Sequence, residues 1–196
     1  MKKNSDKIKI LYTIPNFDTA GSGIALFQLA QKLDKKKFTF EIACTSNRGY
    51  LFKKIIKLGI KVHVFDLYFS ARPILVMLKN CLELSRLLKS INPDIIHSYH
   101  YASDYTEPLA AKFAGIKWIY TKKNMSWEGP SYRSWKIRST LANGIICQNK
   151  DMLKDFFYES KKARDILDEE FVEFGPIKRN INEFFNLYNT KFYDIA

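Results

Sequence analysis

The 196-residue sequence is poor in the residues that build metal or disulfide sites. It has 3 cysteines and 3 histidines, and no Cys-x-x-Cys or Cys/His cluster with metal-ligand spacing. Cys44, Cys81 and Cys147 are far apart and lie inside apolar runs, which predicts three reduced, buried thiols in a cytoplasmic protein. We therefore expect neither a bound metal nor a disulfide framework.

The sequence also lacks long apolar runs. No stretch approaches the length of a membrane-spanning helix, and the basic N-terminus has no apolar signal region and no small-residue cleavage site. We interpret residues 1–6 as a disordered tail before the first strand. With 46% hydrophobic and 27% charged residues, the composition excludes disorder of the whole chain.

Acidic residues are scarce relative to basic ones. The chain has 20 Asp and Glu against 32 Lys and Arg, which gives a formal net charge of +12. This balance suits anionic partners, namely phosphorylated substrates, nucleic acid or acidic lipid headgroups. The charge alone does not choose among them.

Short apolar strands alternate with amphipathic helices along the chain. Strands are expected at residues 8–14, 38–45, 60–66, 95–97, 117–121 and 144–147. Helices are expected at residues 24–33, 50–58, 73–91, 106–114, 132–141 and 150–168. The alternation predicts an α/β fold: a doubly wound, mainly parallel six-stranded Rossmann-like sheet in the order 3-2-1-4-5-6, with helices on both faces.

Two segments of this pattern carry more specific expectations. The apolar spacing of the helix at 73–91 assigns Ile74, Leu75, Leu78, Cys81, Leu82, Ser85 and Leu88 to its inner face. We expect the sheet domain to span residues 7–160 and residues 161–196 to form a C-terminal helical extension. The aromatic-rich segment 171–196 is expected to pack as a helix over the sheet domain or over a second copy of the chain.

Three loops are expected to meet in one crevice, because ligands of such sheets bind beyond the carboxyl ends of the strands at the switch point of the strand order. The first carries Gly21, Ser22 and Gly23 before a helix N-terminus, where free N–H groups and glycine flexibility suit an anion. The second carries Ser98, Tyr99, His100 and Tyr101. The third carries Lys122, Lys123, Asn124 and Trp127. The glycine loop is neither a G-x-G-x-x-G fingerprint nor a Walker A loop, and a plain connecting turn is the alternative.

The histidines and the basic segment leave alternatives open. His97 ends an apolar strand and is either a core residue with its hydrogen bonds satisfied or a ligand contact. His100 is the better candidate for a ligand contact, and we interpret His63 as structural. Between Lys117 and Arg138, six basic residues interleave with aromatic ones. That mixture suits phosphate plus sugar, or nucleic acid, or a solvated face over core tryptophans; we consider nucleic acid unlikely.

Several segments together resemble the N-terminal half of family-4 glycosyltransferases of the two-domain GT-B architecture. They are KIKILYTIPNF, AGSGIALFQLAQKLD, LGIKVHVFDL, PDIIHSYH, AAKFAGIKWIYT and LANGIICQNKDML, within about residues 7–155. The chain departs from the family pattern at three site positions. Gly23 replaces an acidic residue, Tyr99 replaces the second histidine of H-x-H, and Lys123 lies where many members have histidine.

The resemblance implies a function as well as a fold. In the family, the donor sugar nucleotide binds mainly to a second domain with an E-x7-E motif, and this sequence has no glutamate pair at that spacing. By position, Gly21, Ser22 and Gly23 would face the donor phosphate. His97, His100, Tyr101, Lys122, Lys123, Asn124 and Trp127 would line the acceptor side. No residue is identified as catalytic.

The implied activity is transfer of a sugar from a nucleotide diphosphate to a glycan or lipid-linked acceptor, without a metal or other cofactor. The chain would be a truncated product, a subunit whose partner chain supplies the donor domain, or a divergent stand-alone module. Contact with the inner membrane face fits the net charge. A non-catalytic binding or regulatory module that pairs with such a partner is the alternative. The sugar, the acceptor and the stereochemical outcome are not predicted.

Overall fold

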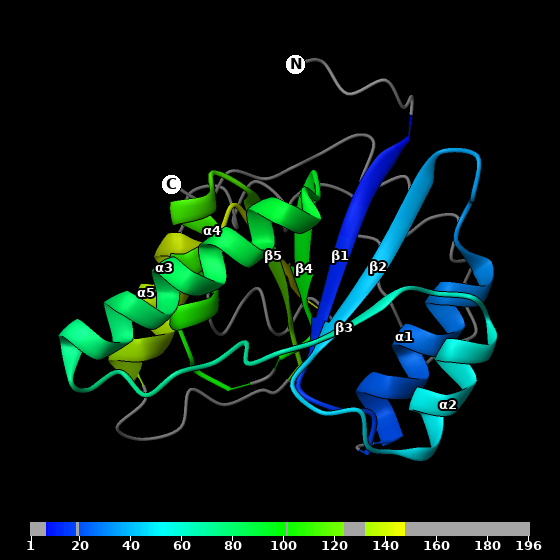
Figure 1. The fold of residues 1–196 in the computed structure, drawn as a ribbon, viewed down its shortest axis with the longest axis horizontal. Helices are drawn as coiled ribbons and strands as arrows, with labels where there is room; N and C mark the ends of the chain where they lie inside the picture. The colour runs from blue at the N-terminus through cyan, green and yellow to red at the C-terminus, as the bar shows by residue number, and fades with distance from the viewer. Residues whose placement is uncertain (1–6, 19, 101, 124–131, 148–196) are drawn as a thin grey trace, which may run out of the picture.

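The computed structural model describes residues 7–18, 20–100, 102–123 and 132–147, and these form an alternating α/β unit (Figure 1). The strands are β1 (Ile8–Ile14), β2 (Phe38–Cys44), β3 (Val62–Val64), β4 (Ile95–Ser98), β5 (Lys117–Lys122) and β6 (Gly144–Cys147). The helices are α1 (Ala20–Lys32), α2 (Tyr50–Lys57), α3 (Ile74–Ile91), α4 (Thr106–Ala114) and α5 (Tyr132–Leu141). Each of these elements corresponds to one that the sequence predicts.

The six strands form one parallel sheet in the order β3-β2-β1-β4-β5-β6, which confirms the predicted fold class and strand order. The order reverses between β1 and β4, whose register pairs Thr13 with Ser98. Because all strands are parallel, their carboxyl ends share one edge of the sheet. That edge is the expected place for a ligand.

Helices cover both faces of the sheet, and each face has its own core. Figure 1 shows α1 and α2 beside β1 and β2, and α3, α4 and α5 together on the other side. Leu26 of α1 and Ile55 of α2 pack with Tyr12 in one buried cluster. Leu84 of α3 and Ala110 of α4 pack with the opposite-facing Leu11 in the other. Successive strand residues thus point into different cores, as the pleat requires.

Two elements, α1 and β3, differ from the sequence-based bounds by more than one residue. Helix α1 begins at Ala20, so Gly21, Ser22 and Gly23 belong to its first turn and not to a preceding loop. Strand β3 is an edge strand with three paired residues, shorter than the predicted 60–66, although Ile42 N–H still donates to the Lys61 carbonyl beside it. An edge strand has one neighbour, so its pairing ends where that neighbour turns away.

The predicted inner face of α3 is wrong at three positions. Ile74, Leu75 and Leu82 are exposed, whereas Met77, Leu84 and Ile91 are buried in their place. The apolar residues of α3 occupy most of the helix circumference, so their spacing alone did not fix which side faces the sheet.

Other predictions fall partly or wholly on residues outside the described ranges. These are the tail at 1–6, the domain boundary at 160, the helix at 150–168 and the C-terminal extension. The three cysteines are free and buried, as expected. Within the described helices, none is long and apolar enough to cross a membrane.

Candidate functional site

The first turn of α1 lies at the carboxyl edge of the sheet, after the end of β1. The first N–H groups of a helix lack partners inside the helix, and they carry its positive dipole end. Gly21 is exposed, and a Cβ added to it would meet nothing within 4 Å. Gly23 instead packs tightly, since its added Cβ would lie 3.0 Å from Leu51 Cδ1. Neither glycine has a positive φ, so an unusual backbone conformation is not what these two positions require.

A different glycine supplies the unusual backbone conformation at this edge. Gly49, just before α2, has a φ of 103°, and an added Cβ would lie 2.6 Å from the Phe17 carbonyl group. Thr45, which follows β2, donates its N–H and its hydroxyl to the Pro15 carbonyl at 3.0 and 2.6 Å. The loops after β1 and β2 are thereby held together, which fixes the entry of α1.

Lys123 joins α1 to the loop after β4. Its ammonium donates to Ser22 Oγ at 2.7 Å and to the Tyr99 carbonyl at 2.5 Å, and it lies 4.5 Å from the centre of the Tyr99 ring. The ion pairs among the described residues leave it without a carboxylate partner. Burial, assisted by the positive charge of Arg138, lowers the pKa of Lys123 to about 7. The predicted glycine turn and the predicted Lys123 therefore meet.

His97 lies inside the core, near enough to Lys123 to be affected by its charge. It has no exposed surface, and its Nε2 lies 2.8 Å from Thr121 Oγ1. Its ring packs among those of Tyr12 and Tyr99, with centroids 5.4 and 4.8 Å away. Burial and the charge of Lys123 lower the pKa of His97 to about 3, so the imidazole is neutral at physiological pH. His97 is therefore a core residue in this structure.

His100 lies on the other side of the edge, against the loop that follows β3. Its ring stacks on Tyr68 with centroids 3.7 Å apart. Burial, then Arg138 and then Lys123 lower the pKa of His100 to about 3. The two histidines thus face different sides of the sheet, although only two residues separate them.

Lys122 points away from Lys123, because neighbouring strand residues face opposite sides. Its side chain is fully buried, with the ammonium 4.5 Å from the centre of the Trp135 ring. Burial lowers its pKa to about 8. The structure therefore brings Lys123 to Ser22 and leaves Lys122 under α5. Tyr101, Asn124 and Trp127 lie outside the described residues.

A buried charged network lies on the same side of the sheet as His100. The sequence analysis did not predict it. Glu107 of α4 accepts hydrogen bonds from the hydroxyls of Thr13 and Ser98, the latter at 2.8 Å. These two residues are paired in register at the ends of β1 and β4, so Glu107 ties the two strands together at the switch point. Burial raises the pKa of Glu107, and Arg138 opposes that rise.

Arg138 of α5 completes this network. It is fully buried and donates to the carbonyls of Asp104 and His100 and, at 3.4 Å, to Ser98 Oγ. Its guanidinium carbon lies 4.7 and 4.9 Å from the ring centres of Trp118 and Tyr120. The guanidinium therefore holds the loop after β4 from both of its ends.

The sequence offered one signal for this network. Asp104 and Glu107 have the spacing of a helix-capping pair, and the Asp104 carboxylate does accept the Thr106 N–H at 3.1 Å. That motif predicts a solvent-exposed glutamate, whereas Glu107 turns inward. No local pattern distinguishes the two outcomes, because the partners Thr13, Ser98 and Arg138 are distant in sequence.

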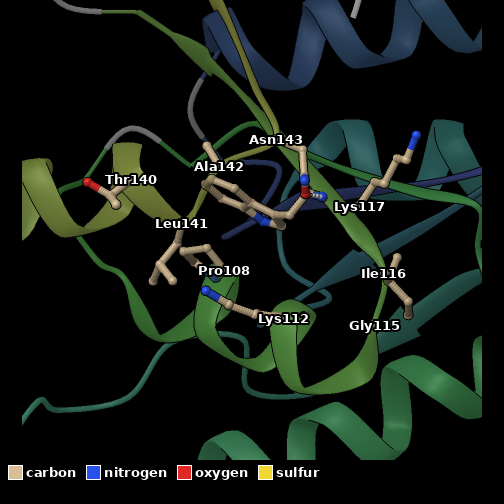
Figure 2. A pocket seen from close by; sticks show the side chains of 10 residues that line it. Pro108, Lys112, Gly115, Ile116, Lys117, Thr140, Leu141, Ala142 and Asn143 are labelled. Atoms are coloured by element: carbon tan, nitrogen blue, oxygen red, sulfur yellow. Dashed lines mark hydrogen bonds between the residues drawn. The ribbon is translucent and has the colours of Figure 1, made fainter. Parts of the chain in front are cut away.

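A pocket of about 350 Å³ lies at the opposite edge of the sheet, where α4 and α5 end and β5 begins (Figure 2). Figure 2 shows Lys112 reaching toward Pro108 and Leu141, while Lys117 points away from them. Two helix C-termini meet there, and their carbonyl ends disfavour an anion. We place the candidate site at the carboxyl edge, where the buried titratable groups gather. Among the described residues, no group of three His, Cys, Asp or Glu could hold a metal.

Comparisons with known proteins agree with this architecture. Residues 19–157 match the model of Glycosyltransferase Family 4. A glycosyltransferase from Rickettsia africae shares 19% identity at a TM-score of 0.58, covering 77% of this chain and 40% of its own. UDP-GlcNAc 2-epimerase from Neisseria meningitidis, bound to UDP-GlcNAc, shares 15% identity at a TM-score of 0.57, with 78% and 44% covered.

HepE from Anabaena, in complex with UDP and glucose, shares 15% identity at a TM-score of 0.59, covering 80% of this chain and 42% of its own. No curated protein sequence matches. The chain thus spans less than half the length of these structures, and identities this low establish the fold alone. The fold matches one half of the GT-B architecture, and the family match covers most of the described sheet domain. The chain belongs to glycosyltransferase family 4.

Proposed function

We propose that this chain is the acceptor-side half of a glycosyltransferase that moves a sugar from a nucleotide diphosphate to a polysaccharide or lipid-linked acceptor in cell-surface glycan synthesis. A donor-binding domain on a partner chain would complete the enzyme. The family match supports the reaction class.

The observation that carries the proposal is the environment of Lys123. A half-buried ammonium that contacts one hydroxyl, one carbonyl and one aromatic face, without a carboxylate, is left with uncompensated positive charge. It lies against the first turn of α1, whose N–H groups also favour negative charge. A phosphate oxygen supplies the charge that both groups lack.

In the proposed reaction, the acceptor hydroxyl oxygen bonds to the sugar carbon as the bond from that carbon to the donor diphosphate breaks, and the departing diphosphate takes up the hydroxyl proton. Lys123 and the N–H groups of Gly21 and Ser22 stabilise the negative charge that develops on the leaving phosphate. Lys123, whose pKa is about 7, takes up a proton as the anion arrives, because a nearby negative charge favours the charged amine. The acceptor is positioned by the loops after β4 and β5, with His100 the foremost of the predicted contacts.

The ligands of structural neighbours support a nucleotide diphosphate as the anion. One neighbour is bound to UDP-GlcNAc and another to UDP and glucose. The proposal also includes the partner chain, the peripheral membrane location and the acceptor contacts predicted for His97, Tyr101, Lys122, Asn124 and Trp127. His97 and Lys122 are buried, so they would influence the acceptor indirectly. His97 would do so through Lys123, and Lys122 through Trp135.

Titration of the full chain with UDP and with pyrophosphate tests the proposal. Lys123→Met should weaken binding of both probes by about tenfold or more, since one charge-assisted hydrogen bond contributes roughly 1.5–3 kcal/mol. Lys117→Met is the matched control, because Lys117 begins the same strand at the opposite edge. Equal binding by the two variants would contradict the phosphate site.

A sugar-nucleotide hydrolysis assay, with and without a co-purifying partner chain, separates the enzyme from the non-catalytic alternative. Turnover that requires both chains supports a split enzyme. Binding of UDP by the pair without turnover of any sugar nucleotide supports the regulatory module.

A further inference from the structure

Ser22 and Lys123 form a close pair of a hydroxyl and an amine at the carboxyl edge of the sheet. Their side-chain atoms Oγ and Nζ lie 2.7 Å apart, although 101 residues separate them in the sequence. Among the described residues, no carboxylate pairs with Lys123. The proposed phosphate site uses the charge of Lys123 and the Ser22 N–H, and it leaves the Ser22 hydroxyl without a role.

The carbonyl of Tyr99 orients the amine of this pair. It accepts a hydrogen bond from Lys123 Nζ at 2.5 Å. A neutral primary amine has two N–H donors and one lone pair, so Lys123 can donate to this carbonyl and accept the Ser22 O–H at the same time. A hydroxyl beside a base that is itself held by a third group is the general arrangement of nucleophilic catalysis.

The Lys123 amine is available as a base near neutral pH. Burial, and then the charge of Arg138, lower the pKa of Lys123 to about 7, so about half of the molecules carry a neutral amine at that pH. A general base works best when its pKa lies near the working pH. A lysine with the ordinary pKa of 10.5 would be almost fully protonated and could not accept the serine proton.

Space for a substrate carbonyl lies next to Ser22, at the neighbouring Gly21. Gly21 is exposed, and a Cβ added to it would meet nothing within 4 Å. Ser22 itself is half-buried in the first turn of α1. The first N–H groups of a helix lack partners inside the helix, so they can donate to the oxyanion that forms when a serine attacks a carbonyl.

We propose that Ser22 and Lys123 are a catalytic serine–lysine pair that hydrolyses carboxylic esters, with Ser22 as the nucleophile and Lys123 as the general base. Esters are the favoured class because an alcohol leaves more readily than an amide nitrogen does, and the pair offers a single group for proton transfer. This activity goes beyond the proposed sugar transfer and does not depend on it.

The reaction has two steps, and Lys123 carries the proton in both. In the first, Ser22 Oγ bonds to the ester carbonyl carbon as the Oγ proton passes to Lys123 Nζ; the bond from that carbon to the alcohol oxygen breaks, and the alcohol leaves with the proton. In the second, a water oxygen bonds to the same carbon and gives one proton to Lys123. The bond to Ser22 Oγ then breaks, Oγ takes the proton back, and the carboxylic acid leaves. One ester and one water thus give one alcohol and one acid.

Labelling of the full chain with a fluorophosphonate, which reacts with activated serine hydroxyls, tests the pair. Peptide mass spectrometry should locate the label on Ser22. Lys123→Met should lower the labelling rate by about a hundredfold or more, which is the usual contribution of a general base. Lys123→Arg keeps the positive charge but cannot be deprotonated, so it should lower the rate to a similar extent.

Ser46→Ala is the matched control. Ser46 is also half-buried and follows β2 at the same edge, but its hydroxyl oxygen accepts the Arg48 N–H at 3.2 Å. This variant should be labelled on Ser22 like the wild type, and thermal melting checks that every variant is folded. Equal labelling of the wild type and Lys123→Arg would overturn the role of Lys123 as the base. Absence of label on Ser22 in the wild type would overturn the pair altogether.

The pH dependence of labelling is a second test that needs no variant. The rate at Ser22 should rise with pH and level off above about 7, where Lys123 is neutral. Of the nearby groups, Arg138 of α5 stays charged, while His97 and His100, each with a pKa of about 3, stay neutral. A rate that keeps rising in proportion to hydroxide through the whole range would indicate an unassisted hydroxyl and contradict the proposal.

Hydrolysis of para-nitrophenyl acetate tests the reaction itself. The chain should release nitrophenolate with turnover and should carry an acetyl group on Ser22 during the reaction. A stable acetyl group on Lys123, with Ser22 unmodified, would make the amine the nucleophile and overturn the proposal. Pyrophosphate binding is measured separately. Labelling without binding contradicts the phosphate site alone, and binding without labelling overturns the serine–lysine pair alone.

Discussion

A fully buried cation, Arg138, and a half-buried one, Lys123, lie on opposite sides of the same sheet edge, and their surroundings differ. Arg138 donates to two carbonyls and to Ser98, whose hydroxyl in turn donates to the Glu107 carboxylate. Lys123 has one hydroxyl and one carbonyl as acceptors, and no carboxylate pairs with it among the described residues. Both rest on aromatic rings.

The comparison separates structural charge from charge available to a ligand. The charge of Arg138 is opposed by the nearby carboxyl groups of Glu107 and Asp104, whose pKa values it holds down, so removing it leaves these buried acids without an opposing charge and two carbonyls without this donor. The ammonium of Lys123 is not neutralised, and burial has already lowered its pKa to about 7. Removing a cation that faces buried carboxyl groups is strongly destabilising, whereas a cation that faces none can take up an external anion.

The largest expected effect is on stability. Arg138→Met should lower the free energy of unfolding by roughly 3–5 kcal/mol, because it leaves the Glu107 carboxylate buried without its compensating charge. Lys123→Met should change it by less than about 1 kcal/mol, because Ser22 can bind water instead. Urea unfolding of both variants measures the difference, and equal losses would contradict the distinction between the two cations.

A double-mutant cycle sharpens this result. Adding Glu107→Leu to Arg138→Met should recover part of the lost stability, since no buried charge then remains uncompensated. Additive losses would show instead that Arg138 stabilises the fold by packing between its aromatic neighbours alone.

The histidine beside each cation should make stability fall in mild acid. The pKa of His97 and that of His100 are both about 3, against an ordinary value of 6.5, so the unfolded chain binds more protons between these values. The free energy of unfolding should therefore fall as the pH drops below 6.5, by up to about 1.4 kcal/mol per pH unit for each histidine.

Urea unfolding between about pH 7 and pH 5 measures this slope while most carboxylates remain ionised. His97→Gln keeps a side chain able to reach Thr121 but cannot titrate, so it should reduce the slope by one proton. An unchanged slope in this variant would mean that His97 is solvated and protonates as easily in the folded state as in the unfolded one.

The sequence predicted the sheet well because its signals are local. Strands such as Ile8–Ile14 are short apolar runs, and helices such as α4 end at a glycine, here Gly115 with a φ of 72°. The strand order followed from the rules for parallel crossover connections and was confirmed. The inner face of α3 was not predictable, because apolar residues surround that helix and the sheet selects among them only in three dimensions.

The site was predictable in position and only partly in composition. The switch point located the carboxyl edge, and the structure does join Ser22 to Lys123 there. The opposed directions of Lys122 and Lys123 depend on where the pleat of β5 falls, which the sequence does not specify. The Glu107 network joins four elements, so no single segment could reveal it.

The smallest stability effect and the most selective binding effect are expected at Gly21, on the Lys123 side. Gly21→Val places its side chain in open space, because an added Cβ meets nothing within 4 Å, and valine is no worse than glycine inside a helix. Stability should change by only a few tenths of a kcal/mol. The side chain should nevertheless stand over the free N–H groups of the α1 turn and weaken pyrophosphate binding. Gly23→Val is the control: its Cβ would lie 3.0 Å from Leu51 Cδ1, so it should cost about 1–3 kcal/mol through overpacking. If Gly21→Val binds pyrophosphate as well as the wild type does, the α1 turn takes no part in the anion site and Lys123 acts there alone.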